Sequence, residues 1–510
     1  MPQKKSSHIA FLVFILSALP AFNFMLNHFF VTGALVLDCA WFAYLYSNAQ
    51  GWPMNNLPVR EWMGTYFNVH MALIFYLTSF LYSGINLIVP LHNGVYSAIL
   101  HGTWFGIIGL SAFRLMTRDS DKKFLIIPAV LLAVAVSYNG VSLSTFNDPH
   151  YEIVIPAMQV LFFMLFFQNR ILCASLALLF GLLAREDAGL HYFGLFFLLT
   201  LCLLFFDKDK EYRKETLYFA AFGILCLFYS LLIIFYQKTL YPNAQHLEDL
   251  YLGKPLFSHI SQDFIDERLK IYWVDRRFLW VPLLLSLVFS LIRLNPVLSI
   301  GTLAVLPWCL FSFCAKVIGP GTMESYYCFP LLIAIFWPLI ANVLNEKSRI
   351  RPVSRIIDRW LIPAAIILSS IIFFPGSQHM LNNRPWQNFD FKWVFKASTN
   401  FSSLERFLES NKDIHVIYGE YVSALKNDTL THETWLRGLI WVLKEDVFPY
   451  DKLKQYDTVI HSPYTWFEIE VIAKLVKGLT LNHSCRIDGT DLIVYSKYDN
   501  LAVCSPMNSN

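Results

Sequence analysis

The sequence has little charge, since Asp, Glu, Lys and Arg make up only 15% of its 510 residues. Soluble globular proteins have about 25% charged residues, so this deficit excludes an ordinary soluble fold. Basic and acidic residues nearly balance, 40 against 37, for a net charge of +3. Without a basic excess, a nucleic-acid partner is not expected. The sequence also lacks a glycine-rich phosphate loop, HExxH and GxSxG, which argues against an ATP-driven pump or a motif-bearing hydrolase.

Cysteine is also scarce, and the pattern of the nine present excludes a disulfide scaffold or a CxxC site. Seven of them lie in or beside apolar segments, where cysteine usually packs as a small hydrophobic residue. The other two, Cys485 and Cys504, lie in a polar tail. They are the candidate disulfide pair if that tail faces an oxidising compartment.

Hydrophobic residues, in contrast, make up 56% of the chain, and they recur in long runs. A membrane-spanning helix needs roughly 17–25 predominantly apolar residues. The runs predict an α-helical polytopic membrane protein with about 11 transmembrane helices. They fall at residues 9–30, 94–116, 124–146, 152–168, 171–184, 188–206, 216–236, 278–293, 296–315, 327–344 and 360–375.

Basic loops give the expected orientation, because Lys and Arg are enriched on the cytoplasmic side. Lys4 and Lys5 place the N-terminus in the cytoplasm, and the basic residues at 114–123 should lie on the same side. The N-terminus and the basic residues at 114–123 can lie on the same side only if the run at 69–91, which Pro90 breaks, is interfacial or re-entrant. We then expect the outer face to hold residues 31–68, 147–151, 185–187, 237–277, 316–326 and the chain after about residue 376.

The tail differs in composition from the rest, which predicts two domains. Residues 1–375 form the transmembrane domain, with outer loops 31–68, 147–151 and 237–277. Residues 376–510 form a small extracytoplasmic α/β domain. Its strands are expected at 414–418, 458–461 and 492–495, and its amphipathic helices at 432–445 and 465–478.

Ionisable residues in or beside membrane helices are costly, and each is therefore a candidate for function. Asp38 follows the first predicted helix, where it can act as a general base or serve as a helix-end cap. His70 lies just before the re-entrant run, and an ordinary interfacial histidine is the alternative. Lys316 and Tyr326 flank an irregular loop, where Lys316 can meet a lipid phosphate or be an ordinary loop charge.

Two short loops carry more charge than a turn requires. Asp148, His150 and Glu152 crowd a loop for which Asn147-Asp-Pro149 alone would suffice, and these residue types also bind divalent metals. Arg185-Glu186-Asp187 places three consecutive charges between two apolar runs. There Arg185 can clamp a phosphate, and the acids can bind a metal or sugar hydroxyls.

The order of these sites resembles the membrane family called domain of unknown function 2079. Leu37-Asp-Cys-Ala-Trp-Phe42, Gly51 and Phe67-Asn-Val-His70 resemble its opening. Asn147-Asp-Pro-His-Tyr-Glu152, Arg185-Glu-Asp187 and Ser325-Tyr-Tyr-Cys-Phe-Pro330 resemble its later blocks. The resemblance covers about residues 30–345. Ser325 stands where a histidine is expected, and the tail has no counterpart.

That family is similar to the GT-C glycosyltransferases, and the resemblance implies a lipid-linked, polyprenyl-phosphate sugar donor. It gives Asp38 the role of catalytic base, and Asp148 or Glu152 the role of the second outer acid. His70, His150, Arg185, Glu186, Asp187, Lys316 and Tyr326 would bind substrate. A divalent cation, if there is one, would sit on Asp148, His150 and Glu152. The expected location is a bacterial inner membrane, and the acceptor stays open.

Two other readings stay open. A transporter or lipid flippase also places charges in a helical bundle, but it usually shows inverted repeats, and none is visible in the sequence. In a non-catalytic membrane subunit, Arg185-Glu186-Asp187 would be a structural ion-pair cluster.

Overall fold

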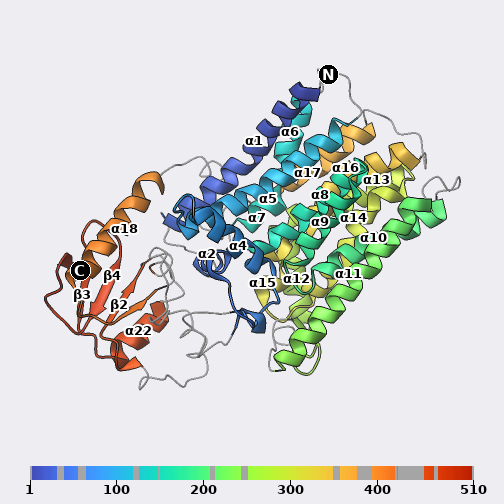
Figure 1. Ribbon diagram of the computed structural model, residues 1–510. Coiled ribbons are helices and arrows are strands. Elements are labelled where there is room, and N and C mark those ends of the chain that lie inside the picture. Colours follow the sequence, from blue (N-terminus) through green and yellow to red (C-terminus); the bar gives the residue numbers. More distant parts are fainter. Residues whose placement is uncertain are drawn as a thin grey trace. The chain divides into compact units, whose positions relative to one another are not determined.

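The computed structural model is mostly helical, with a small sheet near the C-terminus (Figure 1). It agrees with the expected helical membrane protein and C-terminal α/β region. The structure describes residues 3–30, 39–54, 65–118, 126–146, 150–206, 213–242, 251–348, 357–375, 393–419, 422, 453–463 and 469–507.

The first half of the chain contributes helices of very different length. They are α1 (Gln3–Phe30), α2 (Cys39–Asn48), η1 (Tyr66–Asn68), α4 (Ile74–Asn86), α5 (Asn93–Met116), α6 (Ile126–Ser137), α7 (Gly140–Thr145), η3 (Tyr151–Ile153), α8 (Val154–Phe167), α9 (Ile171–Leu182), α10 (Ala188–Phe206) and α11 (Arg213–Leu240).

The second half continues the helical part and then adds the strands. Its helices are α12 (Gln262–Asp275), α13 (Arg277–Ile292), η5 (Pro296–Ser299), α14 (Ile300–Phe313), α15 (Ile318–Gly321), η6 (Ser325–Cys328), α16 (Leu331–Ser348), η7 (Ile357–Leu361), α17 (Ile362–Ile372), α18 (Trp393–Ser410) and α22 (Ile469–Gly478). The strands are β1 (Val416–Tyr418), β2 (Thr458–His461), β3 (His483–Ile487), β4 (Ile493–Ser496) and β5 (Cys504–Pro506).

Six of the described helices are long and apolar enough to cross a membrane, and a bent helix pair raises the number to seven at most. The expected count of eleven is therefore not supported. Three other apolar helices are shorter, and the 12 residues of α9 illustrate the reason. At 1.5 Å per residue they rise only about 18 Å, well short of a hydrocarbon core of about 30 Å.

The chain divides into two compact units. The first holds residues 1–21, 69–74 and 101–385, and the second holds residues 22–68, 75–100 and 386–510. The chain passes from the first unit to the second for the last time after residue 385, near the domain boundary expected at residue 375. The second unit also contains two segments from the N-terminal fifth of the chain, which the expected two-domain division assigned to the transmembrane domain.

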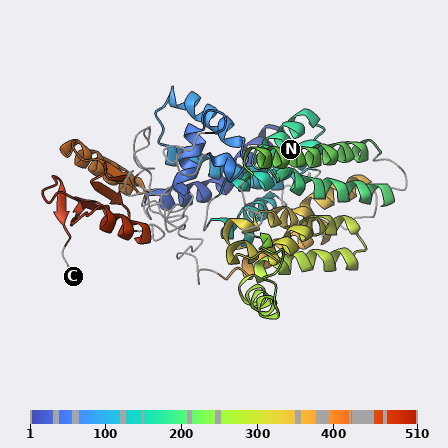
Figure 2. The ribbon, with the colours of Figure 1, turned by 90° about the horizontal axis from the view of Figure 1, so that it is seen from below.

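Within the first unit, glycines allow helices to approach closely. Helices α10 and α11 run side by side (Figures 1 and 2), and a Cβ atom on Gly189 would lie 2.1 Å from the Cys226 carbonyl oxygen. On Gly301 of α14, a Cβ atom would lie 2.4 Å from the Trp337 side chain of α16. Small residues at contacts of this kind are typical of membrane helices, which associate through close packing.

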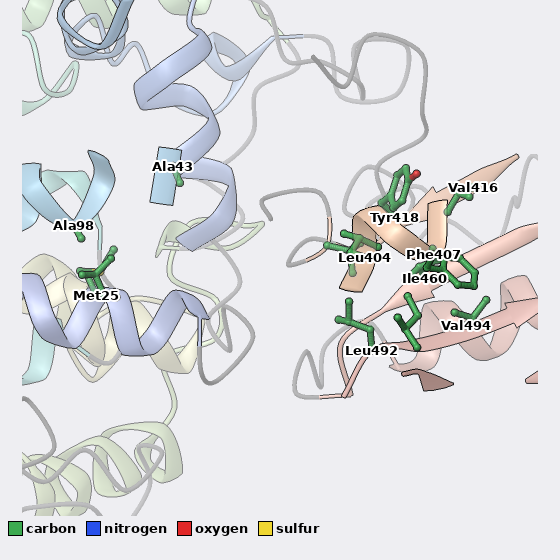
Figure 3. Close-up of a cluster of buried hydrophobic side chains, with 13 residues drawn as sticks. Met25, Ala43, Ala98, Leu404, Phe407, Val416, Tyr418, Ile460, Leu492 and Val494 are labelled. Atoms are coloured by element: carbon green, nitrogen blue, oxygen red, sulfur yellow. The ribbon is translucent and has the colours of Figure 1, made fainter. Parts of the chain in front are cut away.

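In the second unit, the C-terminal sheet has the order β1-β2-β4-β3-β5, with β1 parallel to β2 and the other pairs antiparallel. Tyr418, Ile460 and Val494 pack with Leu404 and Phe407 of α18 (Figure 3). The alternating neighbours Ile417, Val459 and Tyr495 pack in a second cluster, with Ile472 and Leu475 of α22. Because successive side chains of a strand face opposite ways, each face of the sheet is covered by one of these helices.

The expected strands correspond to β1, β2 and β4, and the helix expected at 465–478 corresponds to α22. The helix expected at 432–445 lies outside the described residues, and β3 and β5 were not expected. Cys485 of β3 and Cys504 of β5, the pair expected from the sequence, form a disulfide. The bond joins neighbouring antiparallel strands at the edge of the sheet.

His461 at the end of β2 makes this region sensitive to acid. Its side chain is buried, which lowers its pKa from 6.5 to about 4, although a hydrogen bond to the Ser462 carbonyl partly offsets the shift. The unfolded chain therefore binds this proton near pH 6.5 and the folded chain only near pH 4, so stability falls as the pH drops between these values. At pH 5 the loss is about 2 kcal/mol.

We expect hydrogen exchange of the β2 amides, corrected for the intrinsic effect of pH, to show more opening at pH 5 than at pH 7. His461→Phe keeps a ring beside Tyr495, on which His461 stacks, but it cannot titrate, so its opening should be nearly independent of pH. An equal response of wild type and variant would contradict the prediction.

Candidate functional site

Six ionisable residues expected from the sequence to be functional meet in the first unit. His70 precedes α4, His150 and Glu152 lie at η3, and the other three occupy the turn between α9 and α10. All six are joined by contacts of 4 Å or less into one network, here called the charge network. Its members are His70, His150, Glu152, Arg185, Glu186 and Asp187.

Backbone hydrogen bonds hold the segments of the charge network together. The Ala188 amide donates to the Arg185 carbonyl at 3.2 Å, which starts α10 directly after the charged turn. The Ile74 amide donates to the Leu183 carbonyl at 2.8 Å, which ties the segment carrying His70 to the same turn. Residues far apart in the sequence are thus fixed next to one another.

Arg185 is the centre of the charge network, and each of its three nitrogens faces a carboxylate. Its Nη1 donates to Glu152 Oε1 at 3.4 Å, its Nη2 donates to Asp187 Oδ2 at 2.8 Å, and its Nε lies 3.9 Å from Glu186 Oε1. The residue is only 8% exposed. Burial alone would lower the pKa of Arg185, but the three carboxylates raise it well above its usual value.

Both glutamates have a second partner, a histidine. His70 Nδ1 lies 2.9 Å from Glu186 Oε1, and the Met71 amide donates to Glu186 Oε2 at 3.0 Å. His150 Nδ1 lies 3.1 Å from Glu152 Oε2. Burial would raise the pKa of Glu186, but His70 and Arg185 lower it to about 2. Three carboxylates around one arginine leave an excess of negative charge beside the two histidines.

Aromatic rings lie against the charge network on one side. Tyr326 of η6, expected to bind substrate, stacks on the His150 ring with centroids 3.4 Å apart and an interplanar angle of 6°. Tyr327 in turn contacts Tyr326, with centroids 4.1 Å apart. Such flat surfaces beside charged groups suit a ligand with an apolar face and polar edges, such as a sugar ring.

His191 was missed in the sequence, although it lies one helical turn after Asp187. Its ring packs between Trp308 and Phe329, at centroid distances of 5.2 and 5.5 Å. Asp187 Oδ1 and His191 Nε2 are buried, and neither has a hydrogen-bond partner in the described part of the chain. The spacing of four residues in a helix, which puts both on one face, was the available signal.

The remaining expected residues lie elsewhere or cannot be placed. Asp38 and Asp148 fall outside the described residues. Lys316 is exposed, and none of the contacts that join the charge network includes it.

Two expected roles stay predictions. Arg185 was expected to clamp a phosphate, but its nitrogens already face carboxylates. The suggested metal site includes Asp148, which lies outside the described residues, and among the residues that the structure describes no group of three or more His, Cys, Asp or Glu side chains is arranged to hold an ion. His150 and Glu152 are paired with each other.

Comparison of the chain with models of known protein families gave no match, and comparison with curated protein sequences gave none either. The resemblance to domain of unknown function 2079 therefore stays a prediction. The site has to be interpreted from its own geometry.

The charge network predicts how its removal affects folding. Arg185→Gln leaves three carboxylates without their shared cation, and we expect it to destabilise the chain by about 3–5 kcal/mol. The measurement is the fraction of monodisperse protein in detergent after heating. Arg170→Gln, an exposed residue before α9, should change little. The double variant Arg185→Gln, Glu152→Gln should recover part of the loss, and equal loss in all three variants would contradict the prediction.

Proposed function

We propose that the chain is a membrane glycosyltransferase that moves a sugar from a polyprenyl-phosphate donor to an acceptor outside the cytoplasm. Support comes from one observation, the charge network. Burial of an ion pair is rarely a net gain in stability, because removal from water offsets the attraction. A network of six ionisable residues within an apolar helical unit therefore exceeds what folding requires, and it suggests a polar substrate.

In the proposed reaction, an acceptor hydroxyl attacks the anomeric carbon from the face opposite the phosphate. A carbon–oxygen bond forms to the acceptor while the bond to the phosphate oxygen breaks, so the sugar inverts its configuration. Asp38 takes the hydroxyl proton, and polyprenyl phosphate leaves with the bonding electron pair. A carboxylate base of this kind contributes about 10²–10⁴-fold to the rate.

The geometry gives the described acids different roles in this proposal. Glu152 is fully buried, and both of its oxygens contact neighbours, so it suits positioning of Arg185 and His150 better than proton transfer. Asp187 keeps one buried oxygen without a hydrogen-bond partner among the described residues. That oxygen can accept a hydrogen bond from a sugar hydroxyl. The Tyr326 ring stacks on His150 of the same network, and the Trp308 ring packs against His191.

The proposal also includes the location and the tail. We infer a bacterial inner membrane, with the N-terminus in the cytoplasm and the α/β region outside, where it would help to bind the acceptor. A disulfide within that region is consistent with an oxidising compartment.

One observation favours the alternative of a transporter or lipid flippase. The segments Ile318–Cys328 and Leu331–Asn345 form a bent pair, with 45° between them at a short break. Discontinuous helices of this kind often form substrate sites in secondary transporters. Proton relays also use buried carboxylate–histidine pairs.

The test uses the full chain in lipid vesicles with a panel of polyprenyl-phosphate sugars and a cell extract as the source of acceptor. We expect release of polyprenyl phosphate by the wild type, and a loss of about 10²–10⁴-fold in Asp38→Asn, because the base is removed. Asp499→Asn, an exposed acid of the tail, is the matched control and should keep full release.

Release that survives in Asp38→Asn but is lost in Asp187→Asn would move the base to Asp187. No release from any donor would contradict the proposal, and counterflow of the same lipids across the vesicle membrane would then support the transporter.

A further inference from the structure

Helix α12 and the residue after it are fastened to residues 315–322, which include α15, by three side chains spaced four residues apart. Arg268 donates to the carbonyl oxygens of Ala315 at 3.2 Å and Ile318 at 3.4 Å. Tyr272 donates to Gly321 at 3.2 Å, and Arg276 donates through Nε to Thr322 at 3.0 Å. Spacing by four residues puts Arg268 and Tyr272 on one face of the helix, and Arg276 directly follows the last helical residue, Asp275. Helices α12 and α15 accordingly lie next to each other in Figure 1.

Arg268 differs from the other two because it is a buried charge. It is 4% exposed, and its acceptors are neutral backbone carbonyls. Its Nε has no hydrogen-bond partner among the described residues. The guanidinium lies so close to Gly321 that a Cβ atom there would be 2.7 Å from Arg268 Cζ. Burial of a cation is costly unless an anion accompanies it.

Three other arginines with restricted exposure each have such an anion. Arg185 has the carboxylates of the charge network, Arg276 lies 3.6 Å from Glu324, and Arg293 donates twice to Asp358, at 2.9 and 2.7 Å. No carboxylate of the described chain lies within 4 Å of Arg268. The pKa values of two of these residues differ in the same way, since the carboxylates raise the pKa of Arg185 whereas burial lowers that of Arg268, an effect that the charge of Glu267 partly offsets.

The surroundings of Arg268 suggest where the missing anion comes from. Leu269, Trp273 and Val274 of α12 are exposed apolar residues, and Trp273 stacks on Trp280 with centroids 5.4 Å apart. Exposed tryptophan and aliphatic side chains on a helix that also carries charges are typical of the membrane–water interface. The anions concentrated at that depth are lipid phosphates.

We propose that Arg268 holds the phosphate group of a lipid. Lys316, which lies in the segment 315–322 that Arg268 contacts, assists it. The planar guanidinium matches the geometry of two phosphate oxygens. A phosphate also carries the negative charge that the neutral backbone carbonyls lack. If the proposed function holds, this phosphate belongs to the polyprenyl donor. The site for the phosphate is then Arg268 in place of Arg185, whose nitrogens face carboxylates.

The test measures binding of farnesyl phosphate to the full chain in phosphatidylcholine nanodiscs, with farnesol as the phosphate-free probe. We expect the wild type to bind farnesyl phosphate at least about tenfold more tightly than farnesol, since charge-assisted hydrogen bonds are lost without the phosphate. Arg268→Gln should weaken binding of farnesyl phosphate by roughly 10- to 100-fold, and Arg268→Lys by less. Farnesol binding should be unchanged in both.

Arg276→Gln is the matched control, because Arg276 fastens the same helix to the same segment but already has Glu324. It should bind farnesyl phosphate like the wild type. Equal weakening in Arg268→Gln and Arg276→Gln would show that Arg268 only docks the helix, and it would overturn the proposal. Equal affinity of the wild type for farnesyl phosphate and farnesol would overturn it as well.

If Arg268→Gln does not fold, hydrogen exchange of the wild type still tests the proposed phosphate site. Farnesyl phosphate, but not farnesol, should protect residues 262–275 and 315–322, and lack of this protection would overturn the proposal. Competition with phosphatidic acid distinguishes the two sources of phosphate. If phosphatidic acid displaces farnesyl phosphate, the site binds lipid headgroups in general. If it does not, the site is specific for prenyl phosphates. None of these measurements requires sugar transfer, so the phosphate site and the glycosyltransferase activity can fail independently.

Discussion

The cost of burying charge in an apolar helical protein is the constraint from which the main features of this chain follow. The long hydrophobic runs leave few places where an ionised group is tolerated without a partner. Arg185 meets this constraint by facing three carboxylates, and two of those carboxylates face histidines in turn. The requirement for pairing brings the turn between α9 and α10, the η3 segment and the residues before α4 to one point. The site and the packing of these helix ends are therefore the same feature.

The same constraint explains why the arginines with restricted exposure differ. Arg185 and Arg293 are balanced by protein carboxylates, so they leave no charge for a ligand to neutralise. Arg268 is as deeply buried as Arg185, yet in the described chain it hydrogen-bonds only to neutral carbonyls and lies over the Phe264 ring. An arginine of this kind is a natural site for an external anion, whereas the charge network, with its excess of carboxylates, suits hydroxyl groups. Under the proposed function, the two regions would thus contact different parts of a phosphate-linked sugar.

Much of the charge network was predictable from the sequence, because charges inside short connections between apolar runs stand out. His70, His150, Glu152 and the Arg185-Glu186-Asp187 turn were all expected to be functional. Their pairing was not predictable, since an arginine between two apolar runs gives no sign of which distant carboxylates it will face. Arg268 was missed for a related reason. It lies in a polar helix where charges are ordinary, and only its burial against residues 315–322 distinguishes it.

The sequence by itself determined the helical membrane class, the polar α/β tail, the strands β1, β2 and β4, and the cysteine pair, because composition, apolar run length and alternation act locally along the chain. The number of helices able to span was decided by the structure, since a run that was expected to span, 171–184, forms a helix as short as α9. The structure also decided which charges neutralise one another. Electrostatic pairing depends on distances between residues far apart in the sequence, and only the folded chain sets those distances.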